Sequence, residues 1–136
     1  MSTDRKILRL IQRLLAAAAA AFGLATLVVG GRVLMGFDPG YVVFRPLLFY
    51  NTAMGAAYLA AGVMTWLSLE RGRLAAATIF VLNLLVLGFV GYLYANGQAV
   101  AIESIRAMTF RTGVWLALFL ALAWLSRRAS RAPRAR

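Results

Sequence analysis

The chain contains no cysteine and no histidine, and only four of its 136 residues are acidic. Without thiols and imidazoles it has no ligands of its own for an iron–sulfur cluster, a His-ligated haem or the usual zinc sites. We therefore expect no metal site and no cofactor. The sequence also contains no paired carboxylates, no nucleophile–base set and no glycine-rich phosphate loop. These absences favour a non-enzymatic role over an enzymatic one.

The few acidic residues all lie outside the long apolar segments, at Asp4, Asp38, Glu70 and Glu103. A proton-driven transporter usually carries an ionisable acid inside its membrane spans, because protonation there is coupled to substrate release. The sequence therefore disfavours proton-coupled transport. A passive pore is also disfavoured, because no apolar segment carries a continuous polar stripe.

Hydrophobic residues make up 62% of the chain and charged residues only 14%. The apolar residues form four blocks, each close to the ~20 residues that an α-helix needs to cross ~30 Å of hydrocarbon. We predict an all-α integral membrane four-helix bundle over residues 14–126, with spans at about 14–35, 46–69, 74–95 and 106–126. A basic lead (1–13) precedes it, and a basic tail without regular structure (127–136) follows. The first apolar block is too long for a typical signal peptide, so we expect a retained helix.

The net charge of +11 resides in basic residues at the ends of the apolar blocks. This placement is typical of membrane topology signals and disfavours nucleic-acid binding. Eleven Lys and Arg residues fall in the N-terminal lead, the second connection and the tail, and four fall on the other side. The positive-inside rule then predicts an antiparallel up-down-up-down bundle with both termini cytoplasmic. Fourteen arginines against one lysine, with abundant Ala and Gly, indicate a GC-rich bacterial genome. We therefore expect a multi-pass protein of the bacterial inner (cytoplasmic) membrane.

Turn signals separate the blocks. Asp38-Pro39-Gly40 predicts a turn in the first connection, Glu70-Arg71-Gly72-Arg73 a tight hairpin in the second, and Asn96-Gly97 a helix stop before the third. The residues after Asn96-Gly97, up to Ile105, are too polar to span a membrane, and we expect an interfacial helical turn there. Tyr41, Tyr50, Tyr92 and Tyr94 are expected at the outer interface, where aromatic rings are enriched.

Small residues recur at three- and four-residue steps in the first two blocks, which predicts close helix packing. In the first block they are Ala16, Ala19, Gly23, Thr26 and Gly30, although an alanine-rich helix can produce such a stripe by chance. In the second block Asn51, Gly55, Tyr58 and Gly62 form one narrow line. Tyr58 and Asn83 lie at similar depth on adjacent helices, and we predict a hydrogen bond between them.

Arg111 lies inside the fourth apolar block, at about the same depth as Asn51 and Thr26 on other helices. Three interpretations are open. Its guanidinium snorkels to the outer headgroups, it binds structural partners such as Asn51, Thr26 and Glu103, or it forms an outward-facing anion site with Arg106. The candidate polar site comprises Arg111, Asn51, Thr26, Arg106, Glu103, Thr109 and Thr112. Arg106 and Arg111 point in directions ~140° apart on a helix, which weakens a two-arginine clamp.

Two functions follow as hypotheses. The first is a membrane protein that acts by association, as an accessory or assembly subunit or a homo-oligomer, because the small-residue faces exceed what one short bundle needs. The alternative is a membrane enzyme or carrier that binds a lipid, a quinone or another small molecule in a polar pocket around Arg111. In both cases membrane lipids are expected partners.

Overall fold

The computed structural model describes residues 3–131, which form four α-helices and contain no strand. The helices are α1 (Thr3–Leu34), α2 (Arg45–Leu67), α3 (Leu69–Ala95) and α4 (Ile102–Arg131). Each is long and apolar enough to cross a bilayer. The prediction of an all-α chain with four membrane-span-like helices is confirmed.

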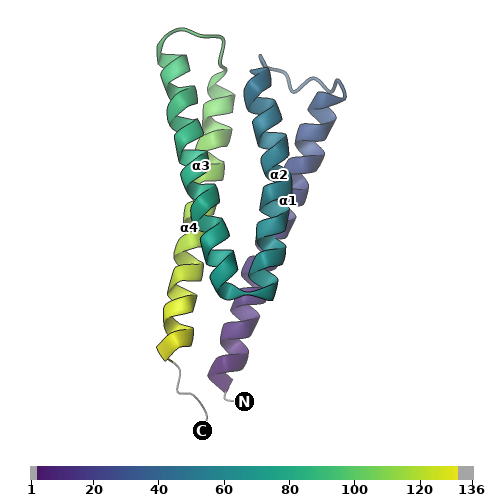
Figure 1. Cartoon of the computed structure of the whole chain (residues 1–136). Coiled ribbons are helices and arrows are strands. Elements are labelled where there is room, and N and C mark those ends of the chain that lie inside the picture. The colour runs from purple at the N-terminus through teal and green to yellow at the C-terminus, as the bar shows by residue number, and fades with distance from the viewer. Residues whose placement is uncertain (1–2, 132–136) are drawn as a thin grey trace.

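The helices form two hairpins that lie side by side (Figure 1). The start of α1 and the end of α4 lie at one end of the molecule together with the α2–α3 connection, and the two longer loops lie at the opposite end. Helix α1 packs mainly on α2, and α3 mainly on α4. Packing between α2 and α3 is less extensive, and that between α1 and α4 is less extensive still. Any site that joins the two hairpins therefore depends on a few side chains that cross between them.

Helices α1 and α2 approach each other closely through the predicted small residues. The buried residues of α1 are those five: Ala16, Ala19, Gly23, Thr26 and Gly30. On α2, a Cβ atom added to Gly62 would lie 2.7 Å from the amide nitrogen of Ala20 and 2.9 Å from the carbonyl oxygen of Ala16. Real side chains do not pack so tightly against backbone, so only glycine permits this approach. The small-residue faces are used within the chain, between α1 and α2.

Helices α1, α3 and α4 begin before their predicted spans, whereas α2 ends two residues before its predicted end. The α2–α3 hairpin turns at Ser68 alone, and Glu70 to Arg73 form the first turn of α3, so the predicted hairpin turn is wrong. Gly72 is a packing glycine instead, buried against Thr65 of α2. The basic lead is helical from Thr3 onward, because Arg, Lys, Leu and Gln are good helix formers and the backbone ladder continues past the apolar block.

Helix α4 also differs from its predicted bounds. It begins at Ile102, within the predicted interfacial turn, and continues through Arg131. The tail was predicted to lack regular structure, and this is wrong for residues 127–131; the rest of it lies outside the described residues. The predicted stop after α3 is confirmed, since Ala95 ends the helix and Gly97 takes a left-handed φ of 74°. Gly40 likewise has φ 82°, and its N–H donates to Asp38 Oδ1 at 2.8 Å.

Two clusters of buried side chains form the interior. The larger one joins all four helices and includes Ala19, Tyr58, Ile79 and Trp115. A smaller one, built on Leu47, Val90, Val100 and Met108, lies towards the two longer loops. Large apolar side chains are exposed on every helix, as expected where the surroundings are lipid.

Candidate functional site

Arg111 of α4 reaches across the interior of the bundle to α1. Its Nη1 donates to Thr26 Oγ1 at 3.3 Å, and Thr26 is only 6% exposed. The guanidinium also lies close enough to the hydroxyls of Tyr50 and Tyr58 on α2 to interact with them electrostatically. Since α1 and α4 otherwise touch little, this contact is one of the few links between the two hairpins.

Both tyrosine hydroxyls converge on one acceptor of α3. Tyr50 Oη donates to Asn83 Oδ1 at 2.9 Å, and Tyr58 Oη donates to the same oxygen at 3.1 Å. The predicted Tyr58–Asn83 hydrogen bond is therefore present, and both residues are fully buried. Tyr50 was expected at the outer interface, but its hydroxyl points into the bundle instead. The only sequence signal for this inward role of Tyr50 was its position next to Asn51, which lies at about the same depth as Thr26 and Arg111.

Aromatic rings enclose the polar groups. The Tyr58 ring lies between Trp115, with centroids 4.9 Å apart, and Phe22, with centroids 5.6 Å apart. Phe22 also contacts Phe110, with centroids 6.1 Å apart. Trp115 is 1% exposed. Charge interactions are stronger in such surroundings than in water, and an unpaired polar atom there is correspondingly costly.

Three enclosed polar atoms have no hydrogen-bond partner within the described part of the chain. They are Asn51 Oδ1, Asn83 Nδ2 and Trp115 Nε1. Most buried side-chain polar atoms in proteins are paired, so each of these calls for a reason. Asn51 lines the cavity that is described next.

Arg111 stands between two adjoining spaces. The first is a small cavity of about 80 Å³, where Thr26, Asn51, Ser104 and Arg111 supply polar side chains to a lining that is otherwise mostly apolar. The second is a groove of about 170 Å³ between α1 and α4, lined mainly by apolar residues that include Phe22 and Phe110. Thr26, Val29, Ala107 and Arg111 border both. We refer to these as the Arg111 cavity and the Arg111 groove.

The structure brings together only part of the predicted polar site. Thr26, Asn51 and Arg111 line one cavity, as the depth argument suggested. Arg106, Glu103 and Thr109 are exposed and line neither space, because they lie on other faces of α4. The Thr112 hydroxyl is buried but donates to the Met108 carbonyl oxygen of its own helix at 2.8 Å. The guanidinium pair with Arg106 does not form.

Ser104 is a lining residue that the sequence analysis missed. It is buried at the start of α4 and borders the Arg111 cavity. Ser104 lies seven residues before Arg111, about two helical turns away on the same face of the helix, and this spacing could have indicated that it lines the cavity. Residues 3–131 contain no group of three or more acidic or other metal-ligating side chains. Comparisons with protein-family models, curated proteins and solved structures found no match.

Proposed function

We propose that the chain is an integral protein of a bacterial cytoplasmic membrane, with helices running up-down-up-down and both termini inside. The support is the four span-length helices, the position of the start of α1 and the end of α4 at the same end as the α2–α3 connection, and the excess of basic residues at that end. On this orientation the membrane domain spans residues 14–126. The Arg111 cavity then lies nearer the outer face.

Within this membrane, the Arg111 cavity and groove bind an amphipathic molecule with a small anionic head. The observation that carries the proposal is a guanidinium inside the bundle with only neutral groups around it. Among the described residues, no carboxylate lines either space. A charge at the bilayer interior costs at least about 2.5–3.5 kcal/mol, and a carboxylate or phosphate head offsets that cost through charge-assisted hydrogen bonds.

The sizes of the two spaces limit the class of ligand. The cavity, at about 80 Å³, is well below the ~300–1,000 Å³ of sites for drug-sized molecules. It accepts a head group alone, and the apolar groove beside Phe22 and Phe110 accepts a hydrocarbon chain. Asn51 Oδ1 requires a donor, so a head with a hydroxyl or a protonated oxygen suits it. A lipid-like acid or phosphate meets these requirements, which supports a lipid-binding protein or carrier.

Native mass spectrometry of the protein in gentle detergent tests this proposal. The wild-type chain is expected to retain a bound anionic amphiphile, either from the host membrane or from an added fatty acid or phospholipid. Arg111→Leu is expected to weaken the affinity for this amphiphile about 10- to 100-fold, because a hydrogen bond to a charged group contributes ~1.5–3 kcal/mol. Arg106→Leu removes the same charge from an exposed position on the same helix and should leave occupancy unchanged.

A second variant separates ligand binding from folding. Val29 borders both spaces and is 59% exposed, so Val29→Trp obstructs them without changing charge or opening the core. It should also lose the ligand while retaining the wild-type melting temperature. Wild-type protein that carries no ligand even with added lipids would contradict the proposal. An equal loss from Arg106→Leu would contradict it as well.

Association with a partner protein or with further copies of the chain stays a prediction. Its original motivation was the surplus of small-residue faces, and those faces are filled by the α1–α2 contact. The geometry around Arg111 therefore supports ligand binding better than it supports association.

A further inference from the structure

A further cavity lies at the opposite end of the bundle from the long loops, between the start of α1, the start of α3 and the end of α4. Its volume is about 370 Å³, compared with about 80 Å³ for the Arg111 cavity and about 170 Å³ for the Arg111 groove. Three segments far apart in the sequence form it: the start of α1, the first residue of α3 and the end of α4. We refer to it as the basal cavity.

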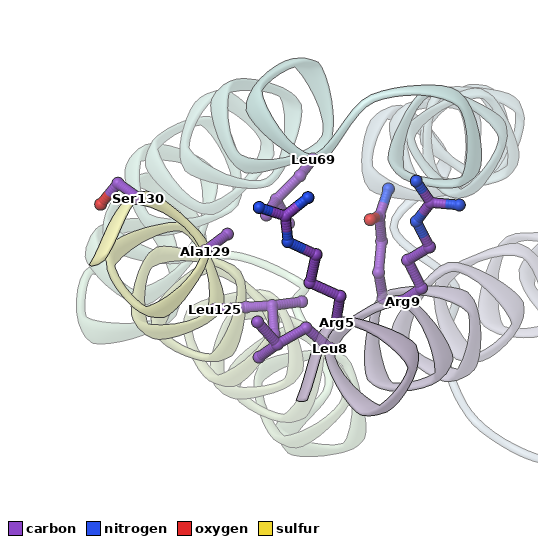
Figure 2. Close-up of a pocket in the computed structure, with 8 residues that line it drawn as sticks. Arg5, Leu8, Arg9, Leu69, Leu125, Ala129 and Ser130 are labelled. Carbon is purple, nitrogen blue, oxygen red and sulfur yellow. The ribbon is translucent and has the colours of Figure 1, made fainter. Parts of the chain in front are cut away.

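The basal cavity combines cationic heads with an apolar floor. Figure 2 shows the Arg5 side chain reaching from α1 into the space between α1, α3 and α4, with Leu8 and Leu125 beside it. Arg9 lies one turn further along α1 and also lines the space. Leu69, at the N-terminus of α3, closes another side. The positive end of that helix adds to the attraction for an anion.

The surrounding charges leave this end strongly positive. Among the described residues it carries nine basic side chains and only two acidic ones, Asp4 and Glu70. Glu70 is paired with Arg73 of the same helix turn. Two of the other arginines lie over tryptophan rings: Arg13 over Trp66, 5.1 Å from the ring centroid, and Arg128 over Trp124, 5.3 Å from it. Tryptophans typically mark the membrane–water interface, so the basal cavity lies at headgroup level.

We propose that the basal cavity binds the phosphate headgroup of one anionic phospholipid, with Arg5 and Arg9 holding the phosphate. Arginine suits this role, because its planar fork donates two parallel hydrogen bonds to phosphate oxygens. The leucine floor and the size of the space favour a lipid over free phosphate, since they also accommodate the glycerol and the first acyl carbons. Assignment to the inner leaflet rests on the orientation proposed above. Lipid binding itself does not rest on that orientation.

Titration with phospholipids of matched acyl chains tests this inference, with native mass spectrometry as the readout. In the Arg111→Leu background, which removes the outer site, phosphatidylglycerol should give one tightly held lipid, and phosphatidylcholine should not. In R5Q/R9Q the affinity for that lipid should fall by about tenfold or more. The matched control is K6Q/R71Q, which removes two positive charges from exposed positions at the same end that do not line the cavity. It should retain the lipid.

Ala129→Trp provides a charge-neutral test. Ala129 is exposed on α4 and lines the cavity, so tryptophan there fills the space without disturbing the core. It should abolish the single tight site. Equal weakening by R5Q/R9Q and K6Q/R71Q would show diffuse attraction and overturn the proposal. If millimolar inorganic phosphate displaced the lipid, the cavity would be a site for free phosphate, and the proposal of a lipid ligand would be wrong. Arg111→Leu should leave this lipid bound, which separates the basal cavity from the outer site.

Discussion

At the scale of single residues, Asn83 is the side chain on which the interior of the bundle depends. Its Oδ1 accepts from both Tyr50 and Tyr58, and so ties α2 to α3 where packing between them is not extensive. The same tyrosines lie beside Arg111, which binds Thr26 of α1. One amide oxygen therefore anchors a set of contacts that reaches all four helices.

The shared acceptor predicts non-additive substitutions. Tyr50→Phe and Tyr58→Phe should each lower the free energy of unfolding by less than about 1 kcal/mol, because Asn83 Oδ1 keeps its other donor. The double variant should cost about 1–3 kcal/mol, because that buried oxygen then has no donor. Unfolding in mixed SDS micelles measures these differences. A double variant equal to the sum of the single ones would show that the two hydroxyls act independently.

At the scale of helices, the glycines of α1 and α2 determine how closely the first hairpin packs. A Cβ atom on Gly23 would meet the Leu59 backbone nitrogen and would lie 2.8 Å from the Gly55 carbonyl oxygen. Both neighbours are backbone atoms and cannot rotate away. In a membrane, where helix association depends on such close contact, the hairpin has little tolerance for larger residues here.

Gly23→Ala is therefore expected to destabilise the protein by about 1–3 kcal/mol through overpacking. Gly31 on the same helix provides the matched control, since an added Cβ there meets nothing within 4 Å. Gly31→Ala should be neutral or should stabilise by up to about 1 kcal/mol through helix propensity. The same micelle unfolding experiment compares the two. Similar losses from both variants would contradict the close-packing explanation.

At the scale of the whole molecule, the two ends of the bundle differ in charge and in the type of site. The end with the chain termini carries most of the basic residues and the basal cavity. Towards the other end lie the Arg111 cavity and the exposed tyrosines Tyr41, Tyr92 and Tyr94. This polarity suits a protein that contacts different chemistry on the two sides of a bilayer.

The proposed orientation predicts which positions are accessible from outside the cell. The chain has no cysteine, so single cysteines can be introduced without background. A membrane-impermeant maleimide should label Val42→Cys and Gln98→Cys, in the two longer loops, on intact cells. Arg71→Cys, beside the α2–α3 connection, should react only after the membrane is permeabilised. Labelling of Arg71→Cys on intact cells would reverse the assigned orientation.

Much of the fold could be predicted because its causes are local. Apolar block length indicated the helices, and Asn96-Gly97 indicated the end of α3. The predicted turn at Glu70–Arg73 failed because Gly72 looks the same in a sequence whether it turns the chain or packs against Thr65. Helix ends were misplaced because good helix formers continue the backbone ladder beyond the apolar core. Of the candidate polar site, Thr26, Asn51 and Arg111 line one cavity, and the other residues do not, since depth can be calculated from the sequence but helix rotation cannot.

The sequence by itself determined the number and class of the helices and the positions of the close-packing glycines of α1 and α2, because these depend on composition and on spacing along one helix. Only the tertiary structure decided which groups meet. Tyr50 turns inward to Asn83, Arg111 binds Thr26 without Arg106 or Glu103, and three distant segments line the basal cavity. The physical reason is that side-chain partners depend on the rotation and tilt of each helix, which packing between helices sets.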